Sequence, residues 1–181
     1  MQFEDNQIKQ FYHPTLVLMC GLPASGKTTF GRKLAKESGA IRFCPDEWIA
    51  DLGIDFFNEE ARAKLETRLW SLGQEFLQLG HSVILENGFW SSAERDELRQ
   101  HAVKLGVDSE IHFFDAPFEE LMRRLEIRNE SGGHGTVPLT RTRMEDYVKL
   151  FQAPDTTELA LFTKAIVHTP TRPRSISKKS L

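Results

Sequence analysis

Short apolar runs alternate along the chain with longer segments in which apolar residues recur every three or four positions. Most of the short runs are apolar at successive positions, as in strands that are buried on both faces of a sheet. The alternation of strand and helix patterns is typical of an α/β domain with a mainly parallel sheet. The five predicted strands cover residues 15–20, 41–44, 82–85, 110–114 and 165–168.

The segments between these runs carry the residues that begin and end helices. Glycine follows three of them, a serine with a glutamate three residues later forms a capping box at the start of one of these three, and a proline opens the last. One long segment has leucine and phenylalanine at spacings of four and three, which indicates a single apolar face. The predicted helices cover residues 27–38, 59–79 and 92–105, and a further segment that begins at Pro117.

Two segments show neither pattern. Residues 129–137 (NESGGHGTV) are polar and rich in glycine between helical sequences, which predicts a mobile loop suited to act as a lid. Residues 169–181 contain two prolines, four basic residues and no apolar period, which predicts a disordered tail. We therefore expect one domain over residues 1–168, with a lid near 129–137 and the tail outside it.

Composition and charge narrow the possible partners. The 181 residues are 40% hydrophobic and 27% charged, with a net charge of −3, so the chain lacks the broad basic field that holds nucleic acid or an anionic membrane. The chain has no leader-like start and no long apolar run, and we expect a cytoplasmic protein. Two cysteines and six histidines show no metal-ligand spacing, which indicates buried free thiols and no transition-metal chemistry.

One glycine-rich segment lies between the first predicted strand and the first predicted helix. Its sequence, GLPASGKT, matches the pattern GxxxxGK[ST] at every fixed position. Glycines at this spacing let backbone N–H groups converge on phosphates, and the helix that follows directs its positive end toward them. A glycine turn with a chance lysine is the alternative, and the strand–loop–helix context disfavours it. The predicted nucleotide-binding residues are Gly21, Leu22, Pro23, Ala24, Ser25, Gly26, Lys27, Thr28 and Thr29.

Two side chains of this segment are candidates for the chemistry itself. We expect Lys27 to reach the β and γ phosphates of ATP and the Thr28 hydroxyl to ligate Mg²⁺, which makes ATP and Mg²⁺ the predicted cofactors. Switch GTPases usually carry an NKxD motif, and this sequence has none. The short chain, the lid and a carboxylate after the second strand favour a kinase, in which an acceptor hydroxyl must be deprotonated beside the γ-phosphate.

Two acidic residues follow predicted strands at the edge where parallel sheets bind ligands. Asp46 comes after the second strand and is the candidate general base, although a residue at this position also commonly caps the next helix. Glu86 ends the third strand, where an acidic residue would help to hold Mg²⁺. The alternative for Glu86 is a strand-end acid that faces solvent.

Three arginines precede the predicted lid. Arg124 and Arg128 are four residues apart and therefore share one helix face, where two guanidinium groups would clamp the triphosphate and stabilise charge during transfer. The alternative is a solvated face in which these arginines and Arg123 pair with Glu120 and Glu126. Because the lid adjoins this helix, we favour phosphate contact for at least one of them. The predicted catalytic residues are Lys27, Asp46, Arg124 and Arg128.

The chain resembles the P-loop kinases of the zeta-toxin, chloramphenicol-phosphotransferase and polynucleotide-kinase group, which are often described only as AAA-family ATP-binding proteins. The resemblance runs almost end to end and rests on four segments in the family's order: GLPASGKTTFGRKLA, FCPDEWIADLGIDFF, SVILENGFWSSAERDELR and FFDAPFEELMRRLEIRN. It implies a three-layer P-loop NTPase fold with strand order 2-3-1-4-5, ATP and Mg²⁺, Asp46 as general base, and Arg124 and Arg128 as lid arginines.

Two positions depart from the family pattern. Ala24 stands where many members have glycine, and Glu86 replaces the more usual aspartate. The longer side chain of Glu86 favours contact near the phosphates or the acceptor over a water-mediated contact with Mg²⁺.

The predicted function is transfer of the γ-phosphoryl group of ATP to a hydroxyl of a small-molecule or nucleotide-like acceptor. The segment from Trp48 to Arg62 is expected to line the acceptor pocket, and its acidic and apolar character argues against a polyanionic nucleic-acid acceptor. Two alternatives stay open. One is a nucleotide-dependent switch or binding module without an acceptor, and the other is a polynucleotide 5′-hydroxyl kinase.

Overall fold

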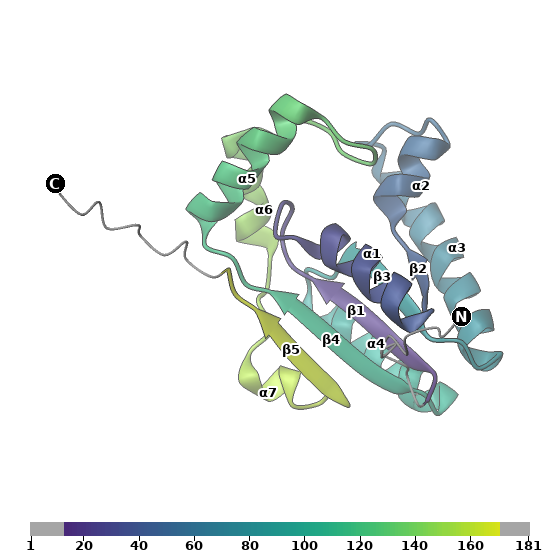
Figure 1. Ribbon diagram of the computed structural model, residues 1–181. Coiled ribbons are helices and arrows are strands. Elements are labelled where there is room, and N and C mark those ends of the chain that lie inside the picture. The colour runs from purple at the N-terminus through teal and green to yellow at the C-terminus, as the bar shows by residue number, and fades with distance from the viewer. Residues whose placement is uncertain (1–12, 171–181) are drawn as a thin grey trace, which may run out of the picture.

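Five strands form one sheet in which every pairing is parallel (Figure 1). The computed structural model describes residues 13–170. The strand order is β2-β3-β1-β4-β5, which confirms the predicted fold class and strand order. The strands are β1 (Thr15–Cys20), β2 (Ile41–Phe43), β3 (Val83–Gly88), β4 (Asp108–Phe114) and β5 (Lys164–His168).

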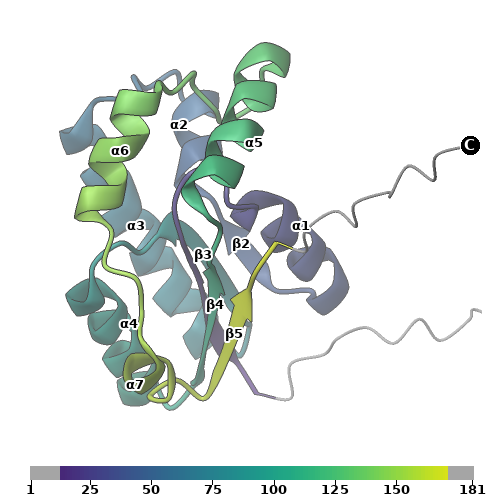
Figure 2. The same ribbon diagram turned by 90° about the vertical axis from the view of Figure 1, so that its left-hand side faces the viewer.

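Helices cover both faces of the sheet and give the predicted three layers. Figure 2 shows α1 (Lys27–Ser38) on one side of the sheet, and α3 (Glu59–Gln78), α4 (Ser92–Leu105) and α7 (Thr156–Leu159) on the other. Three more helices, α2 (Pro45–Asp51), α5 (Phe118–Ser131) and α6 (Arg141–Leu150), lie beyond the carboxyl ends of the strands (Figure 1). Ligands bind parallel sheets at these ends of the strands.

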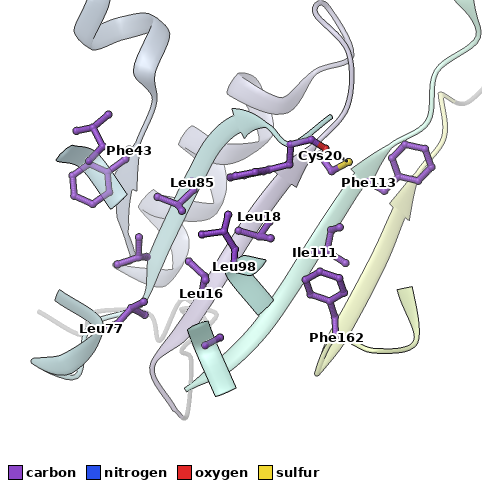
Figure 3. Close-up of a cluster of buried hydrophobic side chains, with 14 residues drawn as sticks. Leu16, Leu18, Cys20, Phe43, Leu77, Leu85, Leu98, Ile111, Phe113 and Phe162 are labelled. Atoms are coloured by element: carbon purple, nitrogen blue, oxygen red, sulfur yellow. Dashed lines mark hydrogen bonds between the residues drawn. The ribbon is translucent and has the colours of Figure 1, made fainter. Parts of the chain in front are cut away.

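Strand β1 divides the core between the two faces. Leu16, Leu18 and Cys20 pack in the cluster that also contains residues of α3 and α4, which Figure 3 shows in close-up. Val17 and Met19 point the other way, into the cluster beneath α1. All five side chains are fully buried, and burial stabilises each large apolar side chain by about 1.5–3 kcal/mol. This packing fixes β1 and therefore the loop that follows it.

Several predicted boundaries differ from the observed ones. Pro117 is the N-cap of α5 rather than its first residue, and α5 runs through Ser131, so the first three residues of the predicted lid are helical. Strand β5 forms an exposed edge rather than a buried strand. Helices α2, α6 and α7 were not assigned from the sequence.

The two ends of the chain limit which predictions the structure addresses. Residues 171–181 of the predicted tail lie outside the described residues. Within residues 13–170, no helix is both long and apolar enough to cross a membrane. Cys20 and Cys44 are buried free thiols, as predicted.

Candidate active site

The predicted phosphate loop, residues 21–28, adopts a backbone that depends on its small residues. Gly21 and Gly26 have φ angles of +146° and +109°, which L side chains rarely adopt. A Cβ atom on Gly21 would lie 3.0 Å from the Phe114 carbonyl oxygen. The Gly21 N–H donates to the Gly88 carbonyl over 2.9 Å, so the loop is held between the ends of β3 and β4.

Ala24 also takes a left-handed conformation, with φ of +61°. A non-glycine residue there carries strain of about 1–2 kcal/mol. This is the position where the sequence departs from the glycine that many P-loop kinases have. The alanine keeps the loop conformation but at a cost in stability.

Lys27 folds back onto its own loop. Its Nζ donates to the carbonyl oxygens of Gly21 and Leu22, both over 2.8 Å. Burial lowers the pKa of Lys27 to about 8, and the negative charge of Asp46 partly offsets that effect. The ammonium group is therefore desolvated at the position where a nucleotide's phosphates would stabilise its charge.

Asp46 is the second residue of α2. Cys44 is the N-cap residue, and no side chain makes a cap hydrogen bond there, so Asp46 does not cap the helix. The Asp46 Oδ1 atom accepts a hydrogen bond from Arg62 Nη2 over 2.8 Å. The charge of Asp46 opposes the lowering of the pKa values of Lys27 and Arg128. Asp46 is therefore near enough to the phosphate loop and to α5 to act electrostatically on both.

The three arginines of α5 have different surroundings. Arg124 donates from Nε to Glu120 over 2.6 Å and from Nη1 to the Ser25 carbonyl of the phosphate loop over 3.1 Å. Arg123 pairs only with Glu120 among the described residues, and its side chain is 59% exposed. The solvated-face interpretation therefore holds for Arg123, whereas Arg124 also reaches the loop.

Arg128 is a guanidinium with unused hydrogen-bonding capacity. Its Nε atom is buried and has no hydrogen-bond partner among the described residues. Desolvation lowers the pKa of Arg128, and Asp46 acts in the opposite direction. Arg128 and Lys27 are close enough to affect one another electrostatically. A buried cation in this state favours an anionic ligand.

Glu86 differs from its predicted arrangement. Strand β3 continues to Gly88, so Glu86 lies within the strand instead of at its end, and its side chain is 1% exposed. Both carboxylate oxygens accept from Arg42, Oε1 from Nε over 2.6 Å and Oε2 from Nη2 over 3.0 Å. The ion pair with Arg42 engages both oxygens of Glu86, and a role for Glu86 in holding Mg²⁺ or its waters stays a prediction. The solvent-facing alternative is wrong, because the side chain is buried.

One protein-family model matches most of the chain. Residues 16–154 match the family model described as an AAA domain. The chain belongs to this family. No curated protein matches the chain.

Several solved structures share the fold of this AAA domain. A protein from Chloroflexus aurantiacus assigned as a kinase has a TM-score of 0.70 and 20% identity, covering 91% of this chain and 92% of that one. Chaetomium thermophilum Kti12 in complex with ADP-AlF3 has a TM-score of 0.64 and 19% identity, with 85% and 88% coverage. A sugar kinase from Janibacter sp. has a TM-score of 0.60 and 21% identity, with 87% and 85% coverage. These similarities confirm the predicted resemblance at the level of the fold.

Thr28 is the second residue of α1, directly after Lys27. Its role as a ligand of Mg²⁺ stays a prediction. Within residues 13–170, no group of three or more His, Cys, Asp or Glu residues could hold a metal ion.

The sequence patterns did not indicate the ion pairs that surround Asp46. Arg62 of α3 bridges Asp46 and Glu66, with Nη1 lying 3.4 Å from the Glu66 carboxylate. Burial raises the pKa of Glu66, while Arg62 and a hydrogen bond from Asn87 act against that rise. The spacing of Arg62 and Glu66 at i and i+4 was the only signal in the sequence, and it is equally typical of a surface ion pair.

The loop after α5 reaches across to α2 (Figure 1). A Cβ atom on Gly135 would lie 3.2 Å from the Glu47 backbone nitrogen and 3.3 Å from the Asp46 carbonyl carbon. His134 Nε2 lies 2.9 Å from Asp51 Oδ1 at the far end of α2. The predicted lid segment therefore closes over the helix that carries the candidate base.

A surface cavity of about 540 Å³ lies elsewhere, between α4 and α7. Three of its charged lining residues form ion pairs, Asp96 with Arg99 and Glu158 with Arg95, and Asp155 accepts from the Glu158 backbone N–H. At the phosphate loop, by contrast, Lys27 and Arg128 have no ion-pair partner among the described residues, and we assign the candidate active site there.

Proposed function

We propose that the protein is an ATP-dependent kinase that transfers the γ-phosphoryl group of ATP to a hydroxyl of a small-molecule or nucleotide-like acceptor. One arrangement carries the proposal: Arg62 holds the Asp46 carboxylate near enough to Lys27 of the phosphate loop and Arg128 of α5 for its charge to act on the pKa of both cations. A nucleotide-binding module needs the two cations but has no use for a carboxylate beside the γ-phosphate. The family match and the kinase structures of the same fold support the proposal.

In the proposed reaction, the Asp46 carboxylate accepts the proton of the acceptor hydroxyl. The hydroxyl oxygen forms a bond to the γ-phosphorus, the bond between that phosphorus and the β–γ bridging oxygen breaks, and ADP leaves with the negative charge. General-base assistance of this kind contributes about 10²–10⁴-fold in rate. Arg62 orients the carboxylate before the acceptor arrives.

The cations of the site have distinct roles in this mechanism. Lys27 exchanges its two carbonyl partners for phosphate oxygens and follows the charge that develops on the β–γ bridge. Arg128 brings an unpaired guanidinium to the equatorial oxygens of the transferring group. Arg124 donates hydrogen bonds to Glu120 and to the phosphate loop. It therefore stabilises the conformation of the loop and also adds a positive charge beside it. Mg²⁺, held by Thr28 and the phosphates, would neutralise charge on the β and γ oxygens.

The charges around Asp46 favour a small acceptor. Arg62 is the cation nearest to Asp46 on the α3 side, and it already faces two carboxylates, those of Asp46 and Glu66. A polynucleotide would need several uncompensated cations along its backbone. The α2–α3 side therefore suits an acceptor with hydroxyl groups and little negative charge.

The direct test is a search for the product. The protein is incubated with ATP, Mg²⁺ and a metabolite extract, and mass spectrometry identifies phosphorylated compounds that the Lys27→Ala variant does not form. We expect at least one small phosphorylated product. ATP hydrolysis that a protein partner stimulates, without such a product, would favour a switch. Phosphorylated oligonucleotide ends, with binding that falls steeply with salt, would favour a polynucleotide kinase.

A further inference from the structure

Arg42 of β2 joins two acidic residues from different elements. Besides its two hydrogen bonds to Glu86, it donates from Nη1 to Glu47 Oε2 over 2.9 Å and from Nη2 to Glu47 Oε1 over 2.7 Å. The side chain of Arg42 is 13% exposed. One guanidinium thus forms paired hydrogen bonds with two carboxylates, a geometry that fixes the orientation of all three groups.

The second cation on Glu47 differs from Arg42 in burial. Arg32 of α1 donates to Glu47 Oε1 from Nε over 3.1 Å and from Nη2 over 2.6 Å. Its side chain is 56% exposed, and it contacts only one oxygen of the carboxylate. Solvent screens such a pair, so it contributes little to order. The hydrogen bonds from Arg42 are the main cause of the low pKa of Glu47, about 2.

Glu47 belongs to the first turn of α2, next to Asp46. This helix has seven residues, and its N-cap makes no side-chain hydrogen bond. A short helix without a cap gains little order from its own backbone. The Arg42–Glu47 pair supplies the missing constraint, because it ties that turn to β2 and, through Glu86, to β3.

The lid rests on the same turn. The Gly135 backbone packs against this turn: a Cβ atom on Gly135 would lie 3.2 Å from the Glu47 backbone nitrogen and 3.3 Å from the Asp46 carbonyl carbon. A shift of the first turn of α2 would therefore move the candidate base and the surface on which the lid closes together.

We propose that Arg42 is a positioning residue for phosphoryl transfer: through Glu47 it holds the Asp46 carboxylate and the lid's contact surface in place relative to Lys27. The inference rests on the proposed function of Asp46. Arg42 touches no reacting atom in this account. Its buried partner Glu86 anchors Arg42 to the sheet. Glu86, which the sequence predicted as a metal ligand, has this anchoring role in the structure.

The test compares two variants with a matched control. Arg42→Gln and Glu47→Ala each remove the Arg42–Glu47 pair, whereas Arg32→Gln removes only the exposed partner of the Glu47 carboxylate. The first readout is hydrogen exchange of the amides of residues 45–51, which needs no acceptor. The second is the initial rate of product formation in the metabolite extract at saturating ATP, together with the affinity for a non-hydrolysable ATP analogue. Should Arg42→Gln fail to fold, Glu47→Ala still decides, because it leaves the Arg42–Glu86 pair intact.

We expect Glu47→Ala to accelerate exchange in residues 45–51 and to lower the product rate about 10- to 100-fold, with analogue affinity within about threefold because ATP contacts lie elsewhere. Arg32→Gln should match the wild type in hydrogen exchange, product rate and analogue affinity. Unchanged exchange and rate in Glu47→Ala, or a loss of analogue affinity as large as the loss of rate, would overturn the proposal. If the wild type forms no product but Glu47→Ala exchanges faster, the positioning of α2 stands and the proposed function fails.

Discussion

The two halves of the candidate site are built in different ways. The donor half is almost contiguous: residues 21–28 form the loop, and α5 adds Arg124 and Arg128 above it. The acceptor half joins four elements, β2, α2, α3 and β3, through ion pairs between residues far apart in sequence, Asp46 with Arg62 and Arg42 with Glu86. The donor half has cations with unused capacity, whereas the charges of the acceptor half are largely paired with one another.

The donor half is built to bind phosphate, and the acceptor half is built to orient Asp46. Unpaired cations in the donor half lower the stability of the free protein, and a bound anion removes that cost, so the donor half favours phosphate binding. Paired charges in the acceptor half bind nothing strongly but hold Asp46 at a fixed place. A common donor half with a separately built acceptor half explains how one fold can serve kinases with unlike acceptors.

The largest expected effect comes from the contact between the halves. Gly31 of α1 packs on Glu86, and a Cβ atom there would lie 1.8 Å from Glu86 Oε1. Gly31→Ala should push Glu86 away from Arg42 and lower the free energy of unfolding by about 3–5 kcal/mol, the usual cost of breaking a buried pair. Denaturant unfolding measures the loss.

Gly73→Ala is the matched control for that change, because Gly73 also lies within a helix. The nearest atom to a Cβ atom there is 3.4 Å away. This variant should gain about 0.5–1 kcal/mol from the better helix propensity of alanine. Equal stability changes in the two variants would show that the Gly31 contact does not matter.

The unpaired cation of the donor half gives the next effect. Arg128→Gln should lower the rate of phosphoryl transfer about 10²-fold, the typical result of removing one donor to a developing charge. The free protein should become more stable, because a desolvated guanidinium with an unpartnered Nε is lost. Arg123→Gln, at an exposed position on the same helix, should change neither quantity. A destabilised Arg128→Gln variant with normal transfer would contradict this assignment.

The pKa of Lys27 gives a test based on the pH dependence of nucleotide binding. The value of about 8 in the free protein means that Lys27 loses its charge as pH rises through 8. Bound phosphates restore a higher pKa, so nucleotide binding takes up a proton above pH 8. The affinity for an ATP analogue should fall roughly 30-fold between pH 7 and pH 9.5. Calorimetric titration measures this fall, and Lys27→Arg, which keeps its charge, should show a flat profile.

The smallest effect concerns the strain in the phosphate loop. Ala24→Gly relieves a left-handed alanine but increases the freedom of the unfolded chain. The difference should raise the free energy of unfolding by about 0.5–1 kcal/mol, with nucleotide affinity unchanged. Thermal unfolding of both proteins measures it, and a loss of stability would show that the loop relaxes without strain.

The same contrast explains how much of the molecule could be predicted from sequence. The strands and the phosphate loop were predictable because apolar runs and GxxxxGK[ST] are local patterns. The strand order was predicted from the family resemblance alone. Arg42 and Arg62 were not identified, because nothing in their neighbours reveals a partner 44 or 16 residues away. For the same reason, the sequence did not indicate that Glu86 is buried in an ion pair with Arg42. Arg95 is likewise fully buried against Glu158, a pairing 63 residues apart that no periodicity indicates.

The central claim is that Asp46 acts on the acceptor while the donor half binds ATP independently of it. The decisive measurement compares Asp46→Asn with the wild type in product rate and in affinity for an ATP analogue. The account predicts a rate lower by about 10²–10⁴-fold with affinity within a few-fold, because a base acts on the acceptor and not on nucleotide binding. Transfer at the wild-type rate in Asp46→Asn would contradict the claim.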